Sequence, residues 1–278
     1  MSHQPKRGSP IGHEKAPSSG SLRKPLYLDA AGICQIRAEG PALRCQMHKG
    51  PDRFFPLARL SRVLVRGPVN IRGDAMLAIM QAGLPITWLT VQGQVAGYVL
   101  TASPRLDALL NQRLEDLAET GELADILENW RLARMRQLIM EEVAPHLGWL
   151  RDLRARSIRS RAGSLIHKRL GIRWDKEIRA FRPLVLSLVL EEWQNVGLSH
   201  FWLDPGPERP DLAALLAGLL EWPLWRIGLK LKQVPDLETW QARIRFFENH
   251  RRALQRRAQQ LMDDLIRHLY GIVPGVGL

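Results

Sequence analysis

Residues 63–89 read "VLVRGPVNIRGDAMLAIMQAGLPITWL", and this stretch decides the fold of the first part of the chain. A short β-branched run is followed by a helical pattern with Asp74 near its start and Gly83 just past its end, which is typical of a helix C-terminus. A second apolar run then continues through "TVQGQVAGYVL" as a hairpin. The stretch therefore predicts a strand, a short helix and a hairpin within one small β-rich domain.

The residues before this stretch predict further strands. The runs "LYLDAAG", "ICQIR" and "ALRCQM" are separated by turn residues, and Leu43, Cys45 and Met47 alternate with Arg44 and Gln46. Alternation of this kind indicates a half-buried antiparallel sheet. We therefore expect an N-terminal antiparallel β domain over residues 25–101. Residues 1–24 mix Gly, Pro, Ser and Lys without periodicity and are expected to be a disordered tail.

Beyond residue 105 the pattern changes to long helices. The segments "RLDALLNQRLEDLAE", "LADILENWRLARMRQLIMEEV" and "LETWQARIRFFENHRRALQRRAQQLMDDLIRHL" have helical periodicity. Expected helix boundaries are Pro145, Pro183, Pro210, Pro223 and Pro235. The second domain is predicted to be all α and to bind nucleic acid, over residues 105–271, with a tail at 272–278. The expected fold class is α+β, with the small β domain first and the larger helical domain second.

The charge balance predicts a polyanionic partner. Forty Lys and Arg residues stand against twenty-eight Asp and Glu residues, a formal net charge of +12, with an isoelectric point near 10.5. This excess favours nucleic acid as the partner. We find no uncharged apolar run of about 18 residues and no apolar segment of the signal-peptide type, so we expect a cytoplasmic protein without a membrane partner.

The basic charge is concentrated in residues 155–174, "ARSIRSRAGSLIHKRLGIRW". A helix over residues 153–169 would carry Ala155, Ile158, Ala162 and Leu165 on one narrow face for packing. The basic residues flank that face, with Arg154, Arg161 and Lys168 on one edge and Arg156 and Arg159 on the other side. A solvated basic face is the simpler interpretation, but such faces usually carry interspersed acidic residues. Residues 155–174 carry none, so we favour phosphate contacts, for which the forked guanidinium is well suited.

Other basic and aromatic segments are weaker candidates for nucleic-acid contacts. Lys230 and Lys232 alternate in "RIGLKLKQ", and the helical segment near the C-terminus carries four arginines, Arg251, Arg252, Arg256 and Arg257. The nine Trp residues mostly lie in apolar helical patterns, which indicates core positions rather than base-stacking platforms. His146, His167 and His200 are scattered without a catalytic motif, and we interpret them as structural or surface residues.

The order of these parts resembles a known family. The segments "LYLDAAG" and "VLVRGPVNIRGDAMLAIMQAGLPITWL", then "RSRAGSLIHKRLGIRW" and "FRPLVLSLVLEEWQNVGLSHFWLDPGPERPDLAALLAGLL", resemble the CRISPR-associated spacer-acquisition integrases, the family called "Cas one". The resemblance spans nearly the whole folded chain. It implies a β-rich domain followed by a helical domain, and DNA as the substrate.

The resemblance also implies where a metal site would lie. In that family a Glu, a His and an Asp bind a divalent cation, and matching the motifs places Arg156, Asp204 and Leu215 at these positions. Only Asp204 is able to hold a cation, and a guanidinium beside a cation is unfavourable. We therefore expect no catalytic residue and no bound metal. Mg²⁺ or Mn²⁺ would be a cofactor only if a shifted register brings His200, Asp211 or Glu221 into the site.

These observations predict a CRISPR integrase-like protein that binds DNA without metal-dependent catalysis, as a structural or regulatory component of a CRISPR-linked complex. The resemblance further implies a homodimer that forms through the β domain, residues 25–101. Candidate partners are the small adaptation subunit called "Cas two" or another CRISPR complex. The residues expected to contact nucleic acid are Arg154, Arg156, Arg159, Arg161, Lys168, Arg169, Lys230 and Lys232. Two alternatives stay open: an active metal-dependent DNA endonuclease and integrase with shifted ligands, and an unrelated basic protein that binds RNA or ribonucleoprotein.

Overall fold

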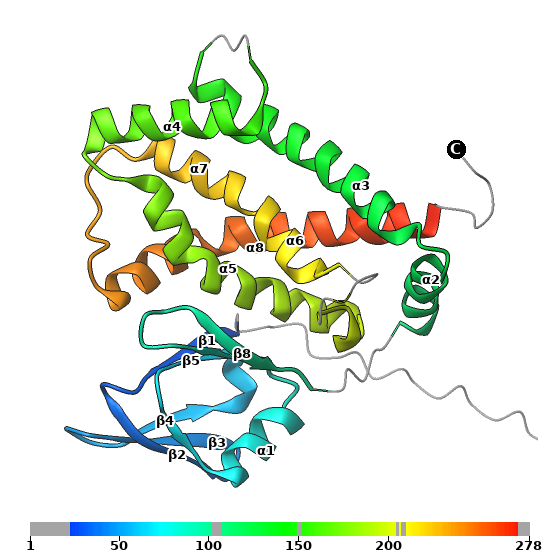
Figure 1. Ribbon diagram of the computed structural model, residues 1–278. Coiled ribbons are helices and arrows are strands. Elements are labelled where there is room, and N and C mark those ends of the chain that lie inside the picture. The colour runs from blue at the N-terminus through cyan, green and yellow to red at the C-terminus, as the bar shows by residue number, and fades with distance from the viewer. Residues whose placement is uncertain (1–22, 102–106, 149–151, 204–205, 207–209, 272–278) are drawn as a thin grey trace, which may run out of the picture.

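The computed structural model describes residues 23–101, 107–148, 152–203, 206 and 210–271. A β-rich region with two sheets comes first, and seven α-helices, α2 to α8, follow it (Figure 1). This arrangement confirms the expected α+β class, with the smaller β part preceding the larger helical part.

The β-rich region consists of two four-stranded sheets and one short helix. The first sheet has the order β1 (Lys24–Asp29), β5 (Leu60–Arg66), β7 (Ile86–Leu89), β8 (Val95–Val99). The second sheet has the order β4 (Arg53–Pro56), β3 (Ala42–Met47), β2 (Ile33–Glu39), β6 (Asn70–Ile71). Helix α1 (Gly73–Gln81) ends before Gly83, whose φ of +68° is the left-handed conformation expected after a helix. The predicted strand, helix and hairpin of residues 63–89 are thus confirmed.

The expected all-antiparallel pairing is wrong for the first sheet, and in the second sheet β2 and β6 also pair in parallel. Strands β1, β5 and β7 are parallel, and only β7 and β8 pair as an antiparallel hairpin. The reason lies in β5, which is covered on both faces: Val63 and Val65 face the core between the sheets, whereas Leu64 packs toward the helices. Strands buried on both faces are typical of parallel pairing. The order β5, α1, β7 supplies the crossover that parallel neighbours need.

The helical region begins at α2. Its helices are α2 (Ala108–Glu119), α3 (Leu123–Leu138), α4 (Ala155–Leu170), α5 (Trp174–Val196), α6 (Leu212–Leu219), α7 (Glu221–Lys230) and α8 (Trp240–Gly271). A π-helical turn, Ile139–Val143, extends α3. Pro183 lies inside α5 rather than at a helix boundary, which corrects the expectation. Buried residues on both sides of Pro183 continue the same helix, so packing outweighs the lost backbone hydrogen bond.

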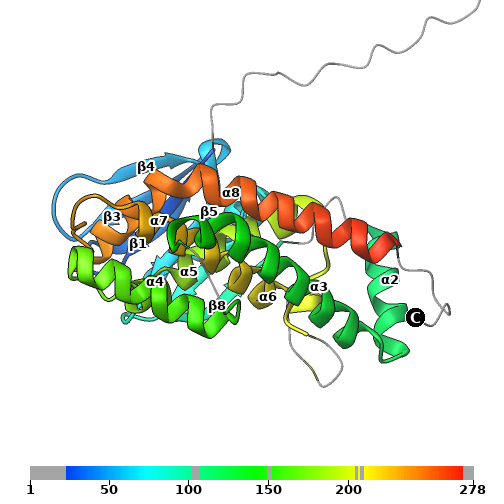
Figure 2. The same cartoon turned by 90° about the horizontal axis from the view of Figure 1, so that it is seen from above.

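Helix α5 is the centre of the helical region and also covers the first sheet. In Figure 1 it runs between that sheet and the remaining helices, and Figure 2 shows α4, α3 and α8 arranged around it. Seven of the nine Trp residues are buried, which confirms their role as core residues: Trp130, Trp174, Trp193, Trp202, Trp222, Trp225 and Trp240. The segment Leu212–Lys230 is apolar enough to cross a membrane, but 72% of its apolar window is buried in the protein, as expected of core helices α6 and α7.

Candidate nucleic-acid interface

Helix α4 carries the basic stretch and begins and ends close to the expected residues. Gly171, with φ +68°, ends the helix, and His167, Lys168 and Arg169 lie in its last turn, where positive charge complements the helix dipole. The buried residues are Ile158, Ala162, Ile166 and Leu170. The expected packing residue Leu165 is 39% exposed. A stripe that advances by four residues at each step follows one side of the helix, so Ile166 faces the core and Leu165 points outward.

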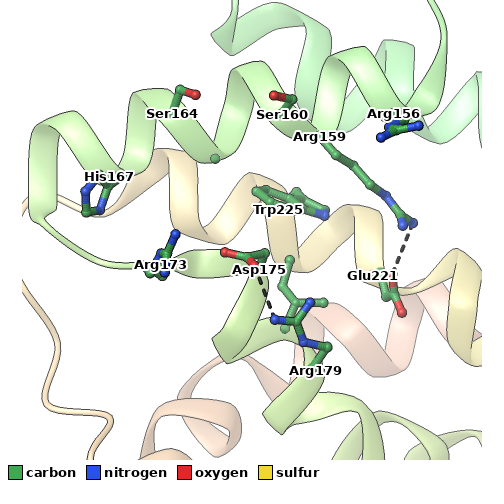
Figure 3. Close-up of a pocket in the computed structure, with 12 residues that line it drawn as sticks. Arg156, Arg159, Ser160, Ser164, His167, Arg173, Asp175, Arg179, Glu221 and Trp225 are labelled. Carbon is green, nitrogen blue, oxygen red and sulfur yellow. Dashed lines mark hydrogen bonds and ion pairs between the residues drawn. The ribbon is translucent and has the colours of Figure 1, made fainter.

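A groove of about 1080 Å³ lies along α4. Helix α4, the start of α5 and helix α7 surround it (Figure 3). Its basic side chains are Arg156, Arg159, Arg173, Arg179 and His167, and its acidic side chains are Asp175 and Glu221. Four arginines therefore face two carboxylates across one opening.

Both carboxylates of the groove are ion-paired to arginine. Glu221, 14% exposed, lies 3.1 Å from Arg159 and 3.7 Å from Arg182. Asp175 lies 3.3 Å from Arg179, one helical turn further along α5. Figure 3 shows the first pair between α4 and α7 and the second pair along α5. The Arg159 guanidinium also stacks 4.7 Å from the ring centre of Trp222, a cation–π contact that fixes its direction.

Two arginines of the groove keep their charge available. Within the described ranges, neither Arg156 nor Arg173 makes an ion pair, and both are exposed. A smaller hollow of about 540 Å³ adjoins the groove and shares Arg156 and Ser160 with it. Arg154 and Arg161 line this second hollow. The two hollows thus form one continuous basic surface along α4, which we call the α4 groove.

Arg154 lines the α4 groove and is ion-paired with Asp152. Its guanidinium donates to both oxygens of Asp152, at 2.8 Å for the closest pair of atoms. Hydrogen bonds from Arg154 and Ser157 hold the pKa of Asp152 well below its usual range. Arg154 is nevertheless 82% exposed, so its charge remains accessible from solvent.

The comparisons with known proteins agree with one another. The family model of CRISPR-associated protein Cas1 matches residues 26–154. A Cas1 protein from Thermotoga maritima is similar in structure, with a TM-score of 0.75 at 14% identity over 92% of this chain and 100% of that chain. Residues 26–154 therefore match the Cas1 family, and the chain has the Cas1 fold over nearly its whole length. The remaining helices, which the family model does not reach, complete the same fold.

Two other solved structures of Cas1 proteins show what relatives bind. The crystal structure of TtCas1 in complex with DNA has a TM-score of 0.62 at 15% identity, over 91% of this chain and 94% of that chain. A Cas6-RT-Cas1–Cas2 complex has a TM-score of 0.59 at 12% identity, over 91% of this chain and 36% of the other. No curated protein matches the sequence significantly.

Cas1 proteins normally use a divalent metal, and the described residues at the positions expected to hold it do not fit one. Within the residues that the structure describes, no three side chains of His, Cys, Asp or Glu gather as a metal site. Arg156 lines the groove with a guanidinium, Leu215 is an alkyl side chain on α6, and Asp175 and Glu221 already hold arginines. Cations repel a further cation. Asp204, the remaining expected ligand position, lies outside the described residues.

The other residues expected to contact nucleic acid gather at the far end of α4. Arg169 donates through Nη2 to the carbonyl oxygens of Gly228, at 3.3 Å, and Leu229, so it caps the C-terminus of α7. Lys230 is exposed at the same end. Partial burial, followed by the charges of Lys230, Arg226 and Arg169, lowers the pKa of His146. Lys168 and Lys232 are exposed beyond this cluster and line none of the described hollows.

The arginine-rich segment of α8 contributes less positive charge to the surface than its sequence indicated. Arg251 is buried and Arg257 is ion-paired with Glu141 and Glu142, so only Arg252 and Arg256 are exposed.

Sequence reasoning missed the α5 side of the α4 groove. Arg173 and Arg179 line it because the left-handed Gly171 turns the chain back and places the first turns of α5 beneath α4. Asp175 and Arg179 are four residues apart, and this spacing could have predicted their ion pair on one face of α5. Glu221 is 62 residues from Arg159, and no local pattern links the two.

Proposed function

We propose that this Cas1-family protein binds DNA along the α4 groove without metal-dependent cleavage, as a structural or regulatory component of a CRISPR-linked complex. The observation that carries the proposal is the set of four arginines around a groove whose two carboxylates are both neutralised. An excess of guanidinium groups in one concave surface suits a phosphate backbone, because each guanidinium presents paired donors to phosphate oxygens.

Arg156 is the central contact of this proposal. It lines both hollows, it is exposed, and it has no acidic partner among the described residues. Arg159, in contrast, is held by Glu221 and by the ring of Trp222, so it positions the groove wall. A phosphate seated at Arg156 would lie between α4 and the start of α5, where Arg173 adds a second free donor group.

The partners follow from the relatives. A Cas1 relative has been solved with DNA and another in a complex with Cas2, so we propose duplex DNA as the ligand and Cas2 as a candidate partner.

We further propose that the protein forms a homodimer through the β-rich region and that it acts in the cytoplasm. Light scattering of the full chain would then show the mass of two copies. A monomer at micromolar concentration would contradict the dimer.

The test compares Arg156→Ala with a matched arginine variant. We expect Arg156→Ala to weaken binding of any DNA sequence several-fold and to lower the slope of log affinity against log salt by about one. Fluorescence anisotropy over a salt series measures both quantities. Arg59→Ala is the control, because Arg59 is also exposed without an ion pair among the described residues but lies in the β-rich region. Equal effects of the two variants would contradict the groove as the binding surface.

Catalysis is tested with a labelled branched DNA, incubated with Mn²⁺ or with EDTA. We expect binding in a gel shift and no Mn²⁺-dependent cleavage or joining. A metal-dependent product that Asp204→Ala or Glu221→Gln abolishes would instead support the active integrase with shifted ligands. The third alternative, an unrelated protein, disagrees with the match of residues 26–154 to the Cas1 family model and with the Cas1 fold of the chain.

A further inference from the structure

A third hollow, of about 670 Å³, lies outside the α4 groove. It opens where the loop of the β7–β8 hairpin meets α5, α6 and the start of α8, so both parts of the fold contribute to it. Arg179 lines this hollow and the α4 groove. The two cavities are therefore neighbours that share one guanidinium.

The walls of this hollow combine two kinds of surface. Pro183, Leu186, Ala217 and Trp240 provide an apolar wall on the helical side. Gln92 and Gln94, which carry amide side chains, also line the hollow from the exposed loop between β7 and β8. A hollow with an apolar wall and amide groups suits a ring that has both a hydrophobic face and hydrogen-bonding edges.

Basic side chains outnumber acidic ones in this hollow, since five Lys and Arg residues line it together with one carboxylate, that of Glu238. Lys176 and Arg182 line the hollow together with Arg179. Arg182 lies 3.7 Å from Glu221, and Arg179 pairs with Asp175. Lys176, in contrast, is exposed and makes no ion pair within the described part of the chain. A free ammonium group beside an apolar wall fits a phosphate that is linked to such a ring through a sugar.

The hollow is held in shape before any ligand arrives. Arg66 on β5 donates through Nε to the carbonyl oxygen of Val91 at 2.9 Å, which fixes the hairpin loop. The same guanidinium lies 5.5 Å from the ring centre of Trp240 on α8 and pairs with Asp29 at 3.1 Å. The loop and the helical wall are thus joined through one side chain, so a ligand would find a preformed site.

We propose that this hollow binds one nucleotide, with the base against the apolar wall and its phosphate at Lys176 and Arg179. The inference rests on the proposed DNA binding, because the shared Arg179 leads from the α4 groove into the hollow. The nucleotide then belongs to an unpaired strand that leaves the groove, and a free mononucleotide is the other source with the same chemistry.

The test fills the hollow without disturbing the core. Ala214 on α6 lines the hollow and is exposed, so Ala214→Phe adds a ring to the cavity while the helix is kept. Ala124→Phe, on the exposed side of α3, is the matched control. Lys176→Ala removes the phosphate contact. Anisotropy at one salt concentration compares a blunt duplex with the same duplex carrying a short unpaired tail, and isothermal calorimetry measures binding of a deoxynucleoside monophosphate.

We expect the wild-type protein and Ala124→Phe to bind the tailed duplex about tenfold tighter than the blunt one. Ala214→Phe and Lys176→Ala should lose most of this preference and bind the blunt duplex as before. Binding of the monophosphate that Ala214→Phe abolishes would also support the site, with a free nucleotide as its ligand. Equal binding of tailed and blunt DNA together with no binding of the monophosphate would overturn the inference and leave the α4 groove intact. Equal loss in both Phe variants would overturn it as well. A protein that binds neither DNA nor monophosphate would contradict both proposals.

Discussion

At the scale of single residues, Glu221 sets the charge of the α4 groove. One carboxylate, 14% exposed, faces two guanidiniums, those of Arg159 and Arg182. Such a carboxylate orders the two arginines but also repels a phosphate backbone. The balance between these effects decides how tightly the groove holds DNA, because Coulomb forces in a partly enclosed groove are less screened than on an open surface.

Glu221→Gln is expected to raise affinity for duplex DNA about fivefold, since one repulsive charge disappears and two guanidiniums are released. The salt dependence should become steeper at the same time. Anisotropy over a salt series measures both. Glu115→Gln on α2 changes the net charge equally at an exposed site and serves as the control. An affinity of Glu221→Gln no higher than that of the control would show that phosphates do not approach this carboxylate.

At the scale of elements, the contact between α5 and α7 sets the width of the groove. Trp174, the first residue of α5, is fully buried and donates through Nε1 to the carbonyl oxygen of Leu224 at 3.1 Å. Gly228 on α7 faces the same indole, and a Cβ atom there would lie 2.5 Å from its Cε2 atom. Only glycine permits α7 to approach this closely.

Gly228→Ala is expected to lower the free energy of unfolding by about 1–3 kcal/mol, because the buried indole has to move. The gain in helix propensity, about 1 kcal/mol, acts in the opposite direction. Urea denaturation followed by fluorescence measures the change. Gly218→Ala on α6 is the matched control, since an added Cβ there meets no atom within 4 Å. We expect it to be neutral or stabilising, and a similar loss in both variants would refute the role of the close approach.

At the scale of the whole molecule, a buried ionic cluster joins the β-rich region to the helices. Arg62 on β5 is 1% exposed and donates to Glu191 on α5. Arg251 on α8 lies 3.3 Å from the other oxygen of Glu191 and 3.2 Å from the Ser61 hydroxyl. Nearby, the Tyr27 hydroxyl donates to Glu248 at 2.6 Å, and burial raises the pKa of that hydroxyl. Four elements, β1, β5, α5 and α8, are linked in this way.

Glu191→Gln is expected to cost about 3–5 kcal/mol of unfolding free energy, because two buried guanidiniums lose their counter-charge. Urea denaturation of the full chain measures the loss. Glu128→Gln on α3, where an exposed carboxylate pairs with Arg131, is the control and should change stability by less than about 1 kcal/mol. A loss for Glu191→Gln as small as that of the control would mean that water or rearrangement compensates the cluster.

The sequence alone determined the order of elements, the basic helix and the family. Strand alternation at Leu43 and Cys45, the helix stop at Gly171 and the buried tryptophans follow from local chemistry, and the structure agrees with each. Periodicity and turn residues act within a few residues of one another, so they are visible without coordinates.

Only the tertiary structure decided how distant residues meet. In the structure β5 pairs in parallel with β1, and α5 continues past Pro183. Glu221 lies opposite Arg159, and Arg251 is buried in the core and not on the surface. Each of these results depends on which faces of two elements are covered at once. The residues that cover a face, and the partner that neutralises a charge, lie far away in the sequence. Local sequence patterns therefore do not predict them.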